Sequence, residues 1–190
     1  TTLGDLTRGV TIKQASDSNK KTNEKSIFVV IPAYNEAGTI GDVLYSLPEQ
    51  IDGYSLTAVV VSDGSKDHTT QRAREHDAIV VEHPINQGQG GSLKTGFEIA
   101  MQYGADIVVT MDADGQHPAN QLPKIVSPII SDEADYVLGS RYRGEDQSGN
   151  SITRQSGIRV FTWVINRLTM TDITDCTNGY RAIRGSRLAD

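Results

Sequence analysis

The sequence of 190 residues has one cysteine, Cys176, which excludes an internal disulfide framework and a metal site made of several cysteines. It lacks any apolar run of the about 18–20 residues that cross a bilayer, and its polar start predicts no signal peptide. The net charge of −6 argues against a general nucleic-acid binder. With 37% hydrophobic and 22% charged residues, we expect a folded, cytosolic chain of one domain.

The two signs of charge are unevenly distributed along the chain. Residues 141–187 have a net charge of +4, whereas residues 1–140 have a net charge of −9. The basic residues of the positive segment are all arginines, namely Arg141, Arg143, Arg154, Arg159, Arg167, Arg181, Arg184 and Arg187. Arginine binds phosphate through paired N–H groups, so this segment is a candidate phosphate site. A solvent-exposed basic helix face is the alternative.

The pattern of polarity changes near residue 25. Residues 16–26 are almost wholly polar, which predicts a flexible N-terminal tail over residues 1–25. Residues 26–190 are expected to form the folded domain. Its apolar runs predict strands over residues 27–31, 57–61, 78–81, 107–111 and 136–138. Residue spacing predicts helices over 40–47, 67–76, 93–101, 122–129 and 158–168.

This alternation of apolar strands and helices predicts an α/β fold. The expected architecture is a three-layer sandwich with a mostly parallel central sheet and helices on both faces. Pro48 should end the first helix, Gly104 should cap the third, and Pro128 should kink or shorten the fourth. Ligands of such sheets bind beyond the carboxyl ends of the strands. The motifs described next all occur at these predicted ends.

The first motif, residues 32–36, follows the first predicted strand and reads Pro-Ala-Tyr-Asn-Glu. Tyr34 can lie against a planar ring, and Glu36 can accept hydrogen bonds from sugar hydroxyls. The alternative is a capped loop, in which Glu36 is simply favourable near a helix N-terminus.

The second motif, residues 62–67, follows the second predicted strand. Asp63 can accept a hydrogen bond from a base N–H or a ribose hydroxyl. Gly64 permits a tight turn, and Asp67 can cap the following helix. An ordinary Asp-Gly turn is the alternative.

A glycine-rich link, residues 86–96, joins a predicted strand to a helix. It fails both the dinucleotide fingerprint G-x-G-x-x-G and the P-loop pattern, because Leu93 stands where each requires glycine. Glycine still lets the backbone approach a ligand closely. The link is interpreted as part of a nucleotide pocket that serves neither NAD binding nor ATP hydrolysis.

The strongest motif is residues 111–118, Met-Asp-Ala-Asp-Gly-Gln-His-Pro, after the fourth predicted strand. Asp112 and Asp114 can converge on one hard divalent cation, Mg²⁺ or Mn²⁺, with a diphosphate completing the coordination. Such a cation would act as a Lewis acid toward a leaving diphosphate. The calcium-loop pattern is not met, because Gln116 occupies its fifth position, and His117 is expected to be a loop residue. A structural Asp-x-Asp turn is the alternative.

The last group combines arginines with a polar turn at residues 172–181. Arg141 follows the fifth predicted strand and should reach the same crevice. Arg154 and Arg159 lie five residues apart and can still clamp a phosphate. Asp175 in the turn can position an acceptor, assist its deprotonation or only hold the turn.

Together these motifs resemble glycosyltransferase family 2, the inverting GT-A type, and within it the polyprenol-phosphate (dolichol-phosphate) hexosyltransferases. The resemblance covers residues 27–187, and the closing pattern D-x-x-[SN]-G-[FY]-R narrows the subfamily. The matching segments are VVIPAYNE (29–36), VVVSDGSKDHT (59–69), NQGQGGSLKTG (86–96), VVTMDADGQHP (108–118), VLGSRY (137–142) and DITDCTNGYRAI (172–183). One departure is Ser62, which replaces the first acid of the usual V-D-D-G-S pattern.

The resemblance implies a GT-A (Rossmann-like) catalytic domain over residues 26–190 and assigns roles by position. Residues implied to bind the nucleotide sugar are Pro32, Tyr34, Glu36, Asp63, Gly91, Asp112 and Ala113. Residues implied to hold Mg²⁺ or Mn²⁺ are Asp112, Asp114 and Gln116. The implied catalytic residues are Asp114, Asp175 and Arg141, and the implied phosphate-binding residues are Arg141, Arg154 and Arg159.

The implied reaction transfers a hexose from GDP-mannose or a UDP-hexose to a polyprenyl or dolichyl phosphate, with inversion. A phosphate monoester is largely ionised near neutral pH, so it needs a strong general base less than a hydroxyl acceptor does. We expect the domain to work at the cytoplasmic side of a membrane, to contact that membrane through its basic C-terminal third, and to lack a C-terminal membrane-associating part. Nucleic acid is not an expected partner.

Other functions remain open at this point. One is a family 2 enzyme that acts on a sugar hydroxyl in glycan or polysaccharide synthesis. Another is a non-catalytic nucleotide-sugar-binding domain, against which the pair Asp112 and Asp114 argues. A nucleotidyltransferase fits less well, because residues 32–34 replace the glycine-rich, lysine-bearing loop that those enzymes carry after the first strand.

Overall fold

The computed structural model describes residues 24–139 and 179–188 of the chain. Most of the predicted tail and the whole of the helix predicted over 158–168 lie outside these residues. The described strands are β1 (Ser26–Ala33), β2 (Gln50–Ile51), β3 (Tyr54–Asp63), β4 (Ala78–His83), β5 (Ile107–Thr110), β6 (Tyr136–Leu138) and β7 (Arg181–Arg184). The described α-helices are α1 (Ile40–Ser46), α2 (Thr69–Arg74), α3 (Gly88–Gln102) and α4 (Leu122–Ile130).

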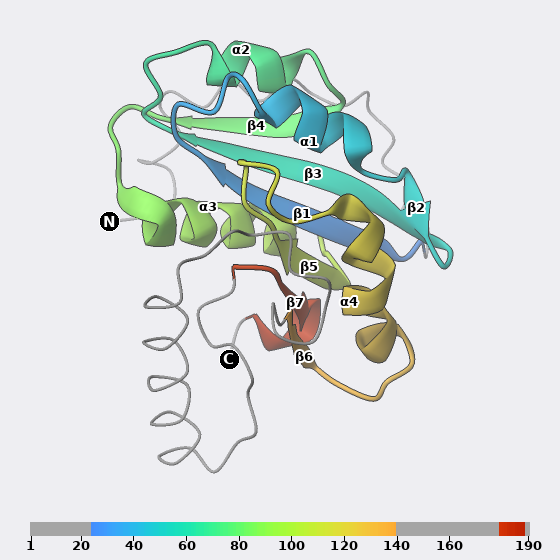
Figure 1. Ribbon diagram of the computed structural model, residues 1–190. Helices are drawn as coiled ribbons and strands as arrows, with labels where there is room; N and C mark the ends of the chain where they lie inside the picture. Colours follow the sequence, from blue (N-terminus) through green and yellow to red (C-terminus); the bar gives the residue numbers. More distant parts are fainter. Residues whose placement is uncertain (1–23, 140–178, 189–190) are drawn as a thin grey trace, which may run out of the picture.

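The strands form one mixed sheet (Figure 1). Its order is β4-β3-β1-β5-β7-β6, and the short β2 pairs with the beginning of β3. β4, β3, β1 and β5 are parallel. β7 is antiparallel to both β5 and β6, so β6 runs in the same direction as β5. The predicted, mostly parallel sheet is therefore confirmed.

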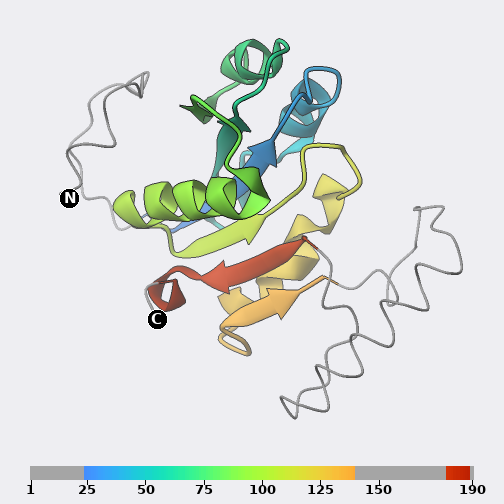
Figure 2. The ribbon, with the colours of Figure 1, turned by 90° about the vertical axis from the view of Figure 1, so that its left-hand side faces the viewer.

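Helices cover both faces of the sheet and complete three layers (Figure 2). β1 is buried on both faces: Ile27, Val29 and Ile31 belong to one hydrophobic cluster, and Phe28 and Val30 belong to the other. The first cluster includes side chains of α1, α2 and α4. The second cluster includes side chains of α3. A strand that is apolar from Ile27 to Ala33 thus lies at the centre of the sandwich, which confirms the predicted α/β architecture.

The end of the described chain forms a strand that the sequence pattern does not predict. No structural element is evident in the sequence of residues 181–190, yet Arg181–Arg184 forms β7, which lies between β5 and β6 in Figure 2. The strand escapes detection because only Ala182 and Ile183 are apolar, and Ala182 alone is fully buried. The neighbouring strands determine its place in the sheet more than its own composition does.

Pro128 lies inside α4. The helix ends at Ile130, two residues beyond the proline. The carbonyl of Pro128 then accepts hydrogen bonds from the N–H groups of Glu133 and Ala134 in the following turn. The apolar stripe of the helix is buried as expected, namely Leu122, Ile125, Val126 and Ile129.

The most deeply buried residues of α3 are small, although Leu93, Phe97 and Ile99 also pack, partly buried, against the second cluster. Its buried positions are Ser92, Gly96 and Ala100, whereas Met101, expected on the apolar face, is 39% exposed. A Cβ atom on Gly96 would lie 2.2 Å from Cγ1 of Val30. Gly96, read in the sequence as part of a ligand-binding link, therefore allows the helix to pack closely against β1.

We expect Gly96→Ala to lower the free energy of unfolding by about 1–2 kcal/mol, because overpacking outweighs the roughly 1 kcal/mol that alanine gains in a helix. Urea unfolding of four proteins measures this: wild type, Gly96→Ala, Val30→Ala and the double variant. Val30→Ala removes the side chain that would clash, so Gly96→Ala should cost less in that background. An equal cost in both backgrounds would contradict the packing argument.

Candidate active site

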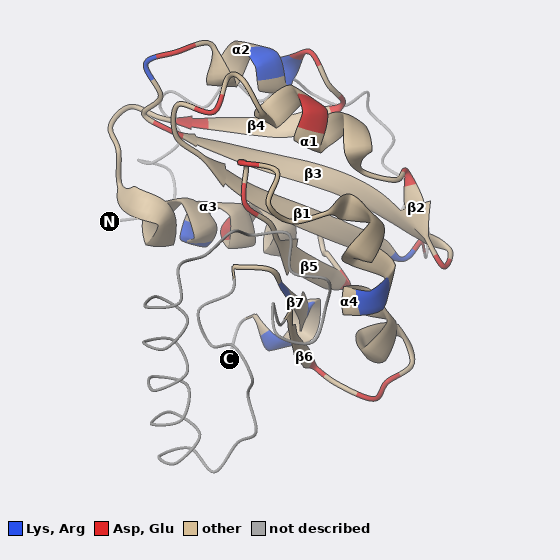
Figure 3. Ribbon diagram, viewed as in Figure 1, with Lys and Arg blue, Asp and Glu red and all other residues tan. Residues whose placement is uncertain are grey.

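The carboxyl ends of the parallel strands border a cleft of about 350 Å³. Of the residues predicted to act at the site, seven line it: Pro32, Tyr34, Glu36, Asp63, Asp112, Ala113 and Asp114. The remaining lining residues are Ala33, Asn86, Gly88, Gln89 and Ser92. Acidic residues in the loops after β1, β3 and β5 lie over the same end of the sheet in Figure 3.

Of the other six predicted site residues, the structure describes two, and neither lines the cleft. Gly91 lies in α3 between two lining residues, and Gln116 is exposed. The other four, Arg141, Arg154, Arg159 and Asp175, lie outside the described residues.

The loops after β1 and β3 are bonded to each other. Asn35, at a φ of 57°, donates its N–H to Oγ of Ser65 at 3.1 Å, and its side-chain oxygen accepts the N–H of Lys66 at 2.8 Å. The N–H of Glu36 donates to Oγ1 of Thr69 at 2.7 Å. These bonds fix the backbone next to Tyr34, which is 46% exposed at the cleft. The exposed ring is thus available to a planar ligand.

Glu36 both bonds the start of α1 and lines the cleft. Its carbonyl accepts the N–H groups of Thr39 and Ile40 at the start of α1. Its carboxylate Oε2 accepts the hydroxyl of Thr39 at 2.8 Å. Glu36 still lines the cleft, so the local bond orients its carboxylate there.

Asp67, which is predicted to cap the helix that follows it, bonds the first residue of that helix. Its Oδ1 accepts the N–H of Thr69, the first residue of α2, at 3.0 Å, although His68 is the N-cap. Its Oδ2 accepts the N–H of Ala37 at 3.1 Å. One carboxylate thus stabilises the start of α2 and joins it to the loop after β1.

Asp63 is 3% exposed and accepts three hydrogen bonds. Its Oδ1 accepts from the N–H of Gln87 at 2.9 Å and lies 2.7 Å from Nδ1 of His83. Its Oδ2 accepts the N–H of Gly88 at 2.8 Å. Burial raises the pKa of Asp63, but the bonds from Gln87, His83 and Gly88 together hold that pKa below its ordinary value of 3.8. Asp63 is therefore an anion at neutral pH.

This lowered pKa predicts a pH dependence of stability. A carboxyl group whose pKa is lower in the folded chain stabilises the fold above its unfolded pKa, and this contribution is lost as the pH falls through the folded value. Asp63→Asn should cost about 2 kcal/mol at pH 7 and less at pH 3. Urea unfolding at pH 7, 5, 4 and 3 measures the difference. A cost that is independent of pH would contradict the assignment.

Asp112 and Asp114 follow β5 on one turn. The N–H of Gln116 donates to Oδ1 of Asp114 at 2.9 Å, which holds that side chain against its own loop. The side chain of Asp112 is 35% exposed, and Nε2 of Gln89 donates to its Oδ1 at 3.4 Å. Both aspartates line the cleft that Asp63 also lines.

His117 and Gly179 are neighbours of Asp112 that the sequence does not indicate. Nδ1 of His117 accepts the N–H of Asp112 at 3.1 Å, and its Nε2 lies 3.6 Å from Oδ2 of Asp112. The His117 ring stacks on Tyr180 with ring centroids 4.9 Å apart. A Cβ on Gly179 would lie 3.0 Å from Oδ1 of Asp112. In the sequence, the pair Asn-Gly at residues 178–179 predicts a turn. The pairing of β7 with β5 is what brings Gly179 close to Asp112.

The carboxylates of Asp112 and Asp114 suit a hard divalent cation whose coordination a bound substrate completes. Within residues 24–139 and 179–188, no three His, Cys, Asp or Glu side chains group so as to hold a metal ion. Magnesium is commonly bound by one or two carboxylates together with substrate phosphates. Asp112 and Asp114 supply that number of carboxylates on one cleft, so they fit Mg²⁺ or Mn²⁺.

Arg184 and Arg187, two arginines of the basic segment, pair with aspartates. Nε of Arg184 bonds Oδ1 of Asp135 at 2.6 Å, its Nη2 lies 2.9 Å from Oδ1 of Asp132, and Nε of Arg187 bonds Oδ2 of Asp135 at 3.0 Å. Arg184 in particular lowers the pKa of the Asp135 carboxyl. These two arginines bind acids of the same chain, and they connect the end of β7 to the turn before β6.

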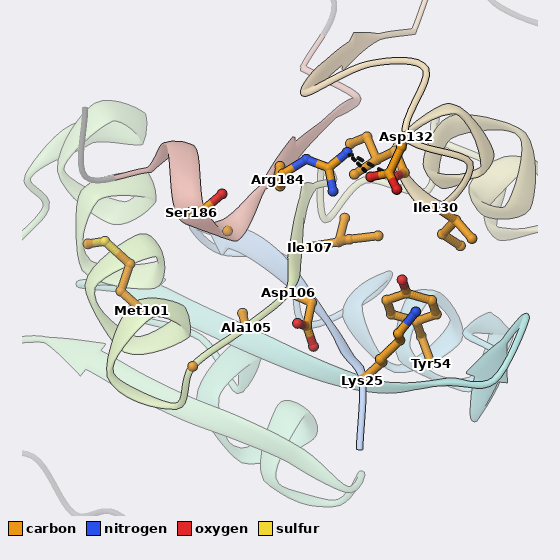
Figure 4. Close-up of a pocket in the computed structure, with 13 residues that line it drawn as sticks. Lys25, Tyr54, Met101, Ala105, Asp106, Ile107, Ile130, Asp132, Arg184 and Ser186 are labelled. Carbon is orange, nitrogen blue, oxygen red and sulfur yellow. Dashed lines mark hydrogen bonds and ion pairs between the residues drawn. The ribbon is translucent and has the colours of Figure 1, made fainter. Parts of the chain in front are cut away.

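A larger cavity, of about 660 Å³, lies where β1, β3 and β5 begin (Figure 4). There Nζ of Lys25 lies 5.0 Å from the centroid of the Tyr54 ring, and Arg184 pairs with Asp132. Of the predicted site residues that the structure describes, none lines this cavity. Because ligands of parallel sheets bind at the opposite ends of the strands, the smaller cleft is the candidate active site.

Comparison with known proteins agrees with this fold and these motifs. The family model "Glycosyl transferase family 2" matches residues 28–188. A UDP-N-acetylglucosamine–dolichyl-phosphate N-acetylglucosaminyltransferase of Methanococcus voltae is 34% identical over 183 residues, which cover 87% of this chain and 72% of the relative. An undecaprenyl-phosphate mannosyltransferase of Micrococcus luteus is 30% identical over 175 residues, which cover 85% and 68%.

The fold is similar to that of a solved enzyme. The glucosyl-3-phosphoglycerate synthase of Mycobacterium tuberculosis, crystallised with Mn²⁺, UDP-glucose and phosphoglyceric acid, superposes with a TM-score of 0.64 at 26% identity. The match covers 85% of this chain, which spans 57% of the length of the solved chain. Fold and motifs together define a glycosyltransferase domain of the GT-A class. The chain belongs to glycosyltransferase family 2.

Proposed function

We propose that this domain transfers a hexose from a nucleotide sugar to a polyprenyl or dolichyl phosphate. The observation that carries the proposal is that one cleft is lined by Tyr34, Glu36 and Asp63 together with Asp112 and Asp114. An aromatic ring and polar acceptors suit a nucleoside and sugar, and paired carboxylates suit a metal diphosphate. The relatives named for dolichyl and undecaprenyl phosphate support the acceptor class.

Each side of the cleft has its own part in binding the donor. The exposed ring of Tyr34 stacks against the base, and Glu36 and Asp63 accept hydrogen bonds from the nucleoside. Ala113 and Pro32 contribute backbone and apolar surface beside them. These contacts hold the donor in one orientation, so that binding energy is used for positioning.

Asp112 and Asp114 are the residues that would hold Mg²⁺ or Mn²⁺, with the donor diphosphate supplying further oxygens. When bound, the ion supplies Lewis-acid stabilisation of the negative charge on the leaving diphosphate. The solved enzyme crystallised with Mn²⁺ and UDP-glucose supports this choice of metal. His117 accepts the backbone N–H of Asp112, and the absence of a side chain at Gly179 leaves room for the Asp112 carboxylate.

In the proposed reaction an oxygen of the lipid phosphate forms a bond to the anomeric carbon of the hexose. The bond between that carbon and the donor diphosphate breaks, and the nucleoside diphosphate leaves with the bonding electron pair. Attack from the opposite face inverts the anomeric configuration. Arg141, Arg154 and Arg159 are proposed to bind the acceptor phosphate, and Asp175 to lie beside it.

The acceptor class also suggests where the domain works. A polyprenyl phosphate stays in a bilayer, so the cleft must open toward a membrane surface, which we propose to be the cytoplasmic one. Within the described residues, no helix combines the length and the apolarity that crossing a membrane requires.

A donor–acceptor panel tests the proposal. UDP- and GDP-linked hexoses are combined with a short polyprenyl phosphate, with a free sugar and with phosphoglyceric acid, each with Mn²⁺, Mg²⁺ or EDTA. We expect labelled polyprenyl-phosphate hexose from one donor type, and none with EDTA. Transfer only to the sugar hydroxyl or to phosphoglycerate would overturn the acceptor assignment. Donor binding without transfer to any acceptor would favour a non-catalytic domain.

A further inference from the structure

His83, the last residue of β4, is a buried polar residue that no motif includes. It is 6% exposed and does not line the cleft. Its Nδ1 lies 2.7 Å from Oδ1 of Asp63, which is its register partner on β3. Its Nε2 lies 2.9 Å from Oγ1 of Thr95, about two helical turns after the start of α3. One ring therefore connects two strands and a helix beneath the cleft.

The direction of the hydrogen bond between His83 and Asp63 follows from the charge of Asp63. The Asp63 carboxylate is an anion that only accepts, so Nδ1 of His83 carries a proton and donates it. Nε2 shares a hydrogen bond with the hydroxyl of Thr95. The series runs from Thr95 through His83 to Asp63.

Asp63 in turn holds the beginning of α3. The N–H groups of Gln87, the N-cap, and Gly88, the first helical residue, both donate to its carboxylate. Their amide protons are therefore bonded within the protein and are not free for a donor phosphate. Gly88 and the neighbouring Gln89 line the cleft, and Gln89 also contacts Asp112. The position of this helix end determines one wall of the cleft.

We propose that His83 and Thr95 are positioning residues for donor binding: they orient the Asp63 carboxylate, which fixes the start of α3 as the wall of the nucleotide-sugar cleft. The inference rests on the proposed function only for the identity of the ligand. The carboxylate of Asp63 has about four acceptor sites, and three are used by His83, Gln87 and Gly88. One site, on Oδ2, remains for the donor, and its direction depends on His83.

Two conservative variants of His83 separate the two ring nitrogens. The amide nitrogen of asparagine comes close to the place of Nδ1, so His83→Asn keeps the donor to Asp63. Glutamine extends to the place of Nε2, so His83→Gln loses that donor. Thr95→Ser keeps the hydroxyl that bonds His83, and Thr95→Val removes it. His68→Gln makes the same change at an exposed histidine and serves as the control.

The first readout is hydrogen exchange of the N–H groups of Gln87 and Gly88, which needs no ligand. His83→Gln should speed this exchange by about tenfold or more, and His83→Asn by much less. The second readout is the KM for whichever nucleotide sugar the wild type uses. His83→Gln and Thr95→Val should raise it about tenfold with kcat within about threefold, whereas His83→Asn, Thr95→Ser and His68→Gln stay near wild type.

Hydrogen exchange and the KM measurement test the role of His83 and the proposed function separately. If the wild type uses no nucleotide sugar, the proposed function fails, and the exchange rates still decide whether His83 holds the helix end. Equal exchange in His83→Gln and wild type would overturn the inference. So would equal losses in His83→Asn and His83→Gln, because a general packing role does not distinguish the two nitrogens.

Discussion

Asp114→Ala is expected to lower the rate of sugar transfer by at least about a hundredfold while the protein stays folded. Asp114 is exposed and lines the cleft, and the one hydrogen bond it accepts within the described residues comes from its own turn. Its removal therefore costs little packing, but it takes away one of the two proposed carboxylate ligands of the metal. Initial rates at saturating donor and Mn²⁺, with the melting temperature of each protein, measure the effect.

Asp77→Ala is the matched control, because Asp77 is exposed and precedes β4 at the end of the sheet away from the cleft. It should keep the wild-type rate. Asp114→Asn should behave like Asp114→Ala, since an amide lacks the charge that binds a divalent cation. Normal turnover of Asp114→Ala with metal and donor would remove the metal assignment.

Gly64→Ala is expected to destabilise the protein by about 3 kcal/mol and to abolish donor binding. Gly64 has a φ of 68°, in the left-handed region, and a Cβ there would lie 2.6 Å from N of Asn86 and 2.7 Å from the carbonyl carbon of Ile85. Both atoms are backbone, so neither can turn away. The loop after β3 would have to separate from the loop after β4, and both Asp63 and Asn86 line the cleft.

Gly53→Ala separates the two causes of this effect. Gly53 has a φ of 80°, but no atom lies within 4 Å of its Cβ position. It should therefore show only the backbone strain, about 1 kcal/mol, and leave nucleotide binding unchanged. Urea unfolding and calorimetric titration with UDP and GDP measure both variants. Similar costs for Gly53→Ala and Gly64→Ala would refute the contact between the two loops.

The alternation of strands and helices can be predicted from the sequence because burial on both faces of the sheet requires apolar strands. A strand covered on both faces needs an apolar residue at every position, and Ile27–Ile31 meets that need. The motifs after successive strands then share one end of the sheet, which is how Tyr34, Asp63 and Asp114 were predicted to lie together. The rule that parallel strands have their carboxyl ends at one edge of the sheet is sufficient for this prediction.

The features that the sequence did not reveal depend on partners distant in the chain. β7 is short, carries arginine at both ends, and becomes an inner strand only by pairing with β5 and β6. Gly96 resembled a ligand-binding glycine, but its neighbour is Val30, which lies 66 positions earlier. His83 gave no signal because its partners, Asp63 and Thr95, are 20 and 12 positions away.

Anomalous diffraction from Mn²⁺, in crystals grown with UDP or GDP, tests the central claim most directly. The account predicts one strong manganese peak beside the carboxylates of Asp112 and Asp114, with the nucleotide in the cleft that Tyr34 and Asp63 line. A nucleotide bound in the cavity near Lys25 and Tyr54, or manganese away from both aspartates, would contradict it.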